Sequence, residues 1–132
     1  LENAGLVQPK LLNLNALKTF VNSPLADRIL KAEKVYTERN FRAPYPAQLA
    51  TGKAEYAGYE VLVQGVMDCV LHNGNEITVI DYKTDYVENM GQLKERYEKQ
   101  LELYRHGAKA LFNTDNVKCL LYSFRLGQFI EF

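Results

Sequence analysis

The chain has 132 residues, 16 basic and 16 acidic side chains, and a hydrophobic fraction of 47%. This length suits one domain, residues 1–132, and the apolar fraction excludes an intrinsically disordered chain. The net charge of zero argues against a free-standing nucleic-acid binder, which usually carries a strong basic excess. Any polyanion would therefore be handled at a focused site.

The sequence contains no apolar run near the ~20 residues that a membrane-spanning helix needs, and no signal-peptide pattern at residues 1–10. Two cysteines, Cys69 and Cys119, are too few for a disulfide framework or a four-cysteine metal site. These features favour a cytoplasmic protein without membrane contact. Because the chain does not begin with Met, we expect it to be a piece of a longer protein.

The N-terminal part shows helical apolar spacing followed by an extended segment. The spacing predicts two helices, at residues 15–21 and 25–35. Residues 36–45 are predicted to be extended, and residues 47–58, which are rich in Ala and Gly, to form a loop.

Two β-rich runs come next, at residues 59–71 and 76–83, separated by His72-Asn73-Gly74-Asn75. An Asn-Gly pair between such runs is the strongest short-range hairpin signal, because a type I′ turn needs positive φ at both central residues. We therefore expect a hairpin in the middle of the chain.

The C-terminal part predicts a long amphipathic helix over residues 89–112, a strand over 117–124 and an edge segment over 127–132. The helix has apolar residues at 3.6-residue spacing, which are Leu93, Tyr97, Leu101, Tyr104, Ala108 and Leu111. Strands flanked by helices on both sides of the sequence indicate an α/β or α+β fold, with a small mixed central sheet flanked by helices.

The hairpin brings charged residues together on one face. Side chains alternate along a strand, so Asp81 and Lys83 share a face with Val79. If Asn73-Gly74 closes a two-residue turn, Asp68 lies opposite Val79, and Asp68 and Asp81 become diagonal neighbours no more than roughly 7–8 Å apart. A four-residue loop over residues 72–75 gives the same register, whereas a bulged three-residue turn does not.

Two close carboxylates and a lysine on one strand face have two readings. The carboxylates repel, and a divalent cation removes that penalty; oxygen-only ligation suits Mg²⁺ or Mn²⁺. The lysine would then polarise a water or stabilise charge on a phosphate in the transition state, which is the equipment for phosphodiester hydrolysis. The alternative is a surface hairpin whose exposed face carries an Asp–Lys pair.

Gln100 interrupts the apolar stripe of the long helix between Tyr97 and Tyr104. A buried amide without a partner costs about 1–3 kcal/mol, so we expect a polar partner or a polar cleft there. Gln100 and Tyr104 are four residues apart and face the same patch. The alternative is a glutamine at the border of the stripe that is exposed to water.

Three motifs, in this order, resemble the RecB-type branch of the PD-(D/E)XK nucleases: Gly65-Val66-Met67-Asp68, Val79-Ile80-Asp81-Tyr82-Lys83-Thr84-Asp85 and Tyr97-x-x-Gln100-Leu-x-x-Tyr104. From about Leu14 to the end, the chain is more similar still to the C-terminal nuclease domains of the bacterial helicase–nucleases of the AddA or RexA kind. The resemblance implies a restriction-endonuclease-like core whose central hairpin carries the active residues.

The resemblance also implies roles for individual positions. The metal ligands would be Asp68, Asp81 and the backbone carbonyl of Tyr82, holding Mg²⁺, for which Mn²⁺ substitutes. The catalytic set would be Asp68 and Asp81 with Lys83, Gln100 and Tyr104. Glu38 would be a supporting residue, since Tyr36-Thr37-Glu38-Arg39-Asn40-Phe41 is similar to a stretch of this family.

By the same resemblance, the chain would be a Mg²⁺-dependent deoxyribonuclease (exonuclease) domain of a helicase–nuclease that processes DNA ends in double-strand break repair and recombination. Its partners would be DNA and a second subunit of the AddB or RexB kind. No Gly-rich phosphate loop is present, so ATP binding would lie elsewhere in the longer protein.

The sequence departs from the family at two points. Met67 stands where the superfamily's name has proline. The family also has an upstream histidine at the metal site, and neither His72 nor His106 lies in that motif, so we expect this ligand N-terminal to Leu1 and slow or absent cleavage by the isolated chain. Two alternatives stay open: a non-catalytic nuclease fold that serves DNA binding or subunit docking, and a different nuclease of the same branch.

Overall fold

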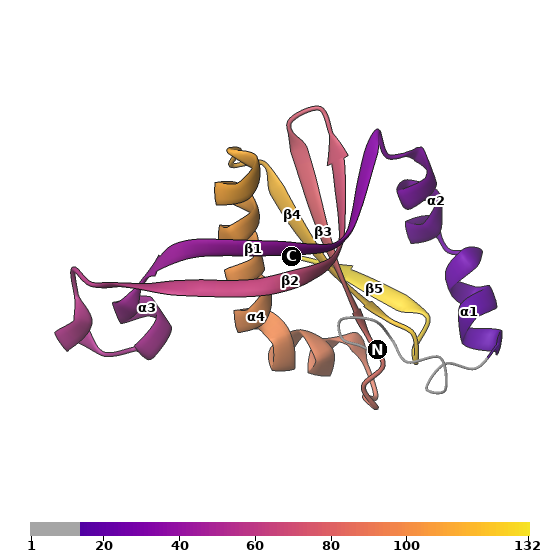
Figure 1. The fold of residues 1–132 in the computed structure, drawn as a ribbon. Helices are drawn as coiled ribbons and strands as arrows, with labels where there is room; N and C mark the ends of the chain where they lie inside the picture. Colours follow the sequence, from indigo (N-terminus) through magenta and orange to yellow (C-terminus); the bar gives the residue numbers. More distant parts are fainter. Residues whose placement is uncertain (1–13) are drawn as a thin grey trace.

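The structure, a computed structural model, describes residues 14–132. Within these residues a five-stranded sheet has the order β1-β2-β3-β4-β5 and carries helices on both faces (Figure 1). The strands are β1 (Lys34–Pro46), β2 (Glu60–Asn73), β3 (Glu76–Lys83), β4 (Val117–Ser123) and β5 (Gln128–Glu131). The helices are α1 (Leu14–Val21), α2 (Pro24–Lys31), α3 (Ala47–Thr51), the 3₁₀ helix η2 (Ala54–Tyr56) and α4 (Met90–Phe112). In this part of the chain no helix is long and apolar enough to cross a membrane.

The sheet is mixed because one connection crosses over. β3 and β4 are parallel, and α4 joins them across one face, while the other neighbouring strands are antiparallel. The core between the sheet and α4 includes Val79, Leu93, Leu101 and Leu121. On the opposite face, α1 and α2 cover a second core that includes Leu25, Ile80, Leu120 and Tyr122. The expected fold class, a small mixed sheet flanked by helices, is confirmed.

β1 and β2 form an arm that extends beyond the sheet (Figure 1). β3 pairs with β2 only over residues 69–73, whereas β1 and β2 continue together to the pair Pro46–Glu60. The ring of Phe41, which is buried, anchors the arm on α4: a Cβ on Gly107 or Gly65 would collide with it. These two glycines are therefore required by the close approach of an aromatic ring.

The strands turn a corner where the arm meets the sheet. Glu38 has φ +51°, and the β1–β2 pairing omits it, passing from Thr37–Cys69 to Arg39–Met67. A left-handed backbone is uncommon for a residue other than glycine, so this position is strained. The bend redirects both strands from the sheet toward α4.

Two sequence predictions of element bounds are wrong. The second helix ends at Lys31 rather than at residue 35, because Lys34 and Val35 pair with β2 and leave the helix. Residues 47–58 are not a simple loop: they contain α3 and η2. Gly52, with φ +74°, ends α3 in the left-handed conformation that favours glycine at this position.

The hairpin is confirmed, but its predicted register is wrong by two residues. Asn73 pairs with Glu76, so the two-residue turn is Gly74-Asn75 rather than Asn73-Gly74. Of these two residues only Gly74 has positive φ, at +59°, which fits a type II′ turn with glycine in first position. Asp68 therefore does not face Val79: one step beyond the pair Cys69–Ile80, the same register sets Asp68 opposite Asp81.

Candidate active site

A cleft of about 280 Å³ opens between the central strands and α4. Because the register error was an even number of residues, the predicted faces are unchanged: Asp68 and Asp81 lie on the side of α4. The lining residues come from β2, β3 and α4 and are Val66, Asp68, Asp81, Tyr82, Lys83, Gln100 and Tyr104. The structure thus brings the sequence-predicted residues into one cleft, with the exception of Glu38.

Asp68 is held in a position that disfavours its charge. Its Oδ2 accepts a hydrogen bond from the Tyr82 backbone N–H at 2.9 Å, and its side chain is in hydrogen-bond contact with Asp81. Burial first, and then the neighbouring Asp81 carboxyl, raise the pKa of Asp68 from 3.8 to about 8, although the Tyr82 N–H and the Lys83 ammonium act in the opposite direction. A bound cation would favour the ionised form of this carboxyl.

Lys83 is the cation nearest to this pair of carboxyls. Its Nζ lies 2.9 Å from Asp81 Oδ2, and the two side chains are only 15% and 4% exposed. No hydrogen-bond donor among residues 14–132 is aligned with that Asp81 oxygen, so the contact is an ion pair without a well-directed hydrogen bond. A buried acceptor oxygen without such a donor is a position that a metal ion can satisfy.

Gln100 has the polar partner that a buried amide requires. Its Oε1 accepts a hydrogen bond from Lys83 Nζ at 3.1 Å. This contact decides between the two readings of the sequence: Gln100 lines the cleft and holds the lysine, and is not simply a border residue exposed to water.

Tyr104 approaches the carboxyls from the next turn of α4. Burial first, and then the charges of Asp81 and Asp68, raise the pKa of Tyr104 to about 12. The phenol therefore keeps its proton at neutral pH and can donate a hydrogen bond into the cleft. Its ring packs edge to face on Phe41, with centroids 5.5 Å apart, so the arm of β1 supports its position.

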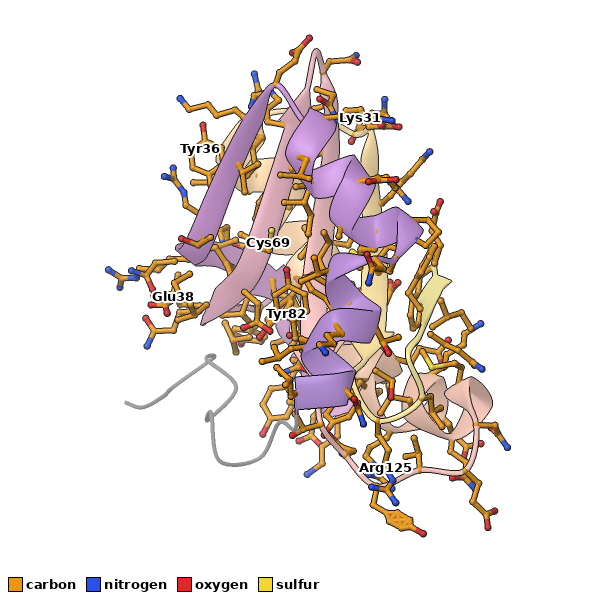
Figure 2. All side chains as sticks on the ribbon, turned by 90° about the vertical axis from the view of Figure 1, so that its right-hand side faces the viewer. Lys31, Tyr36, Glu38, Cys69, Tyr82 and Arg125 are labelled. Atoms are coloured by element: carbon orange, nitrogen blue, oxygen red, sulfur yellow. The ribbon has the colours of Figure 1, made fainter. Side chains whose placement is uncertain are left out.

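The remaining candidates lie apart from the cleft. Glu38 is exposed at the outer edge of the sheet, at the bend of β1 (Figure 2). His72 packs edge to face on Phe112, and His106 Nε2 lies 2.6 Å from the carbonyl oxygen of Pro44. Neither histidine reaches the carboxyls, and no cluster of three His, Cys, Asp or Glu that could hold a metal occurs within residues 14–132.

The donor chemistry of the cleft suits a hard divalent cation. Asp68 and Asp81 supply carboxylate oxygens, and the Tyr82 backbone passes beside them. Mg²⁺ is commonly bound through one or two carboxylates together with water and substrate phosphates. The raised pKa of Asp68 and the unaligned oxygen of Asp81 show that the pair lacks part of the positive charge it could use.

Comparison with known proteins gives the same direction. The family model of the PD-(D/E)XK nuclease superfamily matches residues 7–129. The chain belongs to the PD-(D/E)XK nuclease superfamily. It is also similar to proteins named as ATP-dependent helicase/nuclease subunits, of the AddA kind: 31% identical over 130 residues in Ruminiclostridium cellulolyticum, 32% over 136 residues in Thermoanaerobacter sp. (strain X514) and 32% over 121 residues in Anoxybacillus flavithermus. These matches cover 95%, 95% and 89% of the chain but only 10%, 10% and 9% of the relatives, so the chain spans about a tenth of their length.

In this PD-(D/E)XK domain, three residues beside the cleft had no role predicted from the sequence. Lys83 Nζ lies 3.8 Å from the centroid of the Tyr97 ring. The Tyr97 hydroxyl donates a 2.6 Å hydrogen bond to Asp85 Oδ2, and Arg96 lies 2.7 Å from the same oxygen. The signals were the position of Asp85 two residues after Lys83 and that of Tyr97 one turn before Gln100.

Proposed function

We propose that this chain is a Mg²⁺-dependent deoxyribonuclease domain that hydrolyses phosphodiester bonds, with Mn²⁺ as a substitute metal. The observation that carries the proposal is the opposed pair Asp68 and Asp81 with Lys83 at 2.9 Å, inside a cleft of a PD-(D/E)XK fold. The relatives' names support a wider role, as one nuclease domain of a cytoplasmic helicase–nuclease that acts on DNA ends in repair and recombination, together with a second protein chain.

In this proposal the metal would be held by Asp68, Asp81 and the backbone carbonyl of Tyr82. When bound, it would supply positive charge for a phosphate oxygen and a water of lowered pKa. The carboxylates would also keep the cleft selective for hard cations, because every ligand they offer is oxygen.

Lys83, Gln100 and Tyr104 would act on the substrate side of the cleft. The lysine ammonium can stabilise negative charge that develops on the phosphate, because it is nearly buried and its charge is little screened by water. Gln100 fixes the direction of that ammonium through its 3.1 Å hydrogen bond. Tyr104, protonated at neutral pH, can donate a hydrogen bond to a non-bridging phosphate oxygen.

The test is cleavage of end-labelled linear DNA with Mg²⁺, with Mn²⁺ and with EDTA. We expect metal-dependent cleavage by the wild-type chain and none by Asp81→Ala or Lys83→Ala. The control is Asp115→Ala, which removes an exposed carboxylate from the turn before β4 and should cleave as the wild type does. Metal-dependent cleavage that persists in Asp81→Ala would show that the activity belongs to a contaminant, and absence of cleavage in all samples would favour a non-catalytic nuclease fold.

A further inference from the structure

Lys83 is held by three different kinds of partner. A lysine ammonium has three N–H donors and no acceptor. In this structure it meets the carboxylate of Asp81, the amide oxygen of Gln100 and the ring of Tyr97, at 2.9, 3.1 and 3.8 Å. Because the side chain is only 15% exposed, these contacts rather than water decide where the charge lies.

The three partners differ in whether they remain available during catalysis. In the proposed function Asp81 also serves a metal ion, which competes with Lys83 for the charge of the carboxylate. Gln100 and Tyr97 have no such competing duty. They are therefore the contacts that keep the ammonium in place once Asp81 is shared.

The ring of Tyr97 is itself fixed from behind. Its hydroxyl donates a 2.6 Å hydrogen bond to Asp85 Oδ2, and Arg96 contacts the same oxygen at 2.7 Å. Desolvation opposes the charge of Asp85, but the hydrogen bonds from Tyr97 and Arg96 outweigh it and lower the pKa of this carboxyl. Asp85 is thus an ionised acceptor that orients the phenol.

We propose that Tyr97 is a positioning residue for the catalytic lysine: its ring face seats the ammonium of Lys83, and Asp85 locks the ring through the phenolic hydroxyl. A cation over an aromatic face within about 6 Å is attracted by the ring quadrupole, and more strongly when it is desolvated. Since Tyr97 and Gln100 lie one turn apart on α4, the helix presents a ring and an amide to the same ammonium.

The inference rests on the proposed function for its consequence, but its geometry can be tested without cleavage. The first experiment is NMR of the lysine side chains in the ¹⁵N- and ¹³C-lysine-labelled chain, with the Lys83 signals assigned from Lys83→Arg. We expect the ε-CH₂ and ammonium protons of Lys83 to be shifted upfield by the ring current. The shift should vanish in Tyr97→Leu and persist in Tyr97→Phe, while the signals of Lys94, which lies over the Phe132 ring, stay unchanged.

The second experiment measures DNA cleavage kinetics with saturating Mg²⁺. Tyr97→Leu should lower kcat by about 10- to 100-fold with KM for DNA within about 3-fold, the pattern of a misplaced catalytic group. Tyr97→Phe keeps the ring, so its kcat should fall by less than about 5-fold. The matched control is Tyr86→Leu, which removes another tyrosine beneath a cation, Arg125 at 3.7 Å, and should leave kcat unchanged.

The outcomes separate the inference from the function beneath it. An unshifted Lys83 signal in the wild type, or a shift that survives in Tyr97→Leu, overturns the seating of the ammonium by this ring. A shift that behaves as expected with no loss of kcat in Tyr97→Leu overturns its importance for the reaction. Absence of cleavage by the wild-type chain would refute the proposed function, while the NMR result would still decide the geometry.

Discussion

Replacing Asp68 by asparagine should stabilise the metal-free protein. The native pKa of about 8 lies above the ordinary 3.8, so the folded protein binds more protons than the unfolded chain between these two pH values. Stability must therefore fall as the pH rises from about 4 to about 8. Asparagine has no charge to bury: its oxygen can still accept the Tyr82 N–H, and its amide can donate to Asp81.

The size of the effect follows from the same linkage. The interval from 3.8 to pH 7, at about 1.4 kcal/mol per pH unit, sets an upper limit of about 4 kcal/mol at neutral pH. The buried amide also loses hydration, which costs part of this gain, so we expect Asp68→Asn to raise the free energy of unfolding by about 1–3 kcal/mol. Mn²⁺ at 100 times its Kd should stabilise the wild type by about 2.7 kcal/mol and the variant by far less.

The assay is urea unfolding at pH 5, 7 and 8 with EDTA, and at pH 7 with Mn²⁺. The stability difference between Asp68→Asn and the wild type should widen as the pH rises and reverse when Mn²⁺ is present. Asp115→Asn, at an exposed turn, is the control and should follow the wild type. A variant that is less stable than the wild type at pH 8 with EDTA would refute the argument that Asp68 is held there against its charge.

Three further expectations follow from single contacts. Lys83→Met removes the cation beside Asp81, so Mn²⁺ should bind roughly 3- to 10-fold more tightly by calorimetry while cleavage falls by at least about 100-fold; equal or weaker binding would contradict this. Gly107→Ala forces the Phe41 ring away and should cost about 1–3 kcal/mol in urea unfolding, despite the better helix propensity of alanine; unchanged stability would show that the arm yields freely. Because Asp68 is largely protonated at pH 7, Mn²⁺ binding should release close to one proton there and fewer at pH 9, seen as a dependence of the calorimetric enthalpy on the buffer; an enthalpy independent of the buffer would exclude this.

The faces of the hairpin could be predicted from the sequence, but its register could not. Alternation with period two places Asp68, Asp81 and Lys83 on one side for any turn that shifts the register by an even number of residues. Asn73-Gly74 and Gly74-Asn75 are both acceptable two-residue turns, and local sequence does not choose between types I′ and II′. The choice matters for the chemistry, because it sets the two aspartates opposite one another and not on a diagonal.

The long helix could be predicted because its signal is regular. The apolar spacing and the Asn89 N-cap, whose side chain accepts the Gln92 N–H at 3.0 Å, define α4 with little help from the rest of the fold. The role of Gln100 could not be decided in the same way. A glutamine within an apolar stripe is equally compatible with water and with a buried partner, and only the packing of α4 on β3 identifies Lys83.

The arm and its corner had no sequence signal. A left-handed backbone at Glu38 is unfavourable for this residue type, and it is maintained by long-range pairing between β1 and β2. The bend moves Glu38 to the outer edge, so the supporting role that the family resemblance implied for it stays a prediction. The same arm carries Phe41 onto Gly107, a contact between residues far apart in the chain.

The most direct test of the metal centre is a calorimetric titration of Mn²⁺ into this chain and into Asp81→Ala. We expect one class of site in the wild type, held by Asp68 and Asp81, and its loss in the variant, while Asp115→Ala binds as the wild type does. Binding of equal strength in Asp81→Ala, or no binding to the wild type, would contradict the claim that these opposed carboxylates form the metal centre of a nuclease.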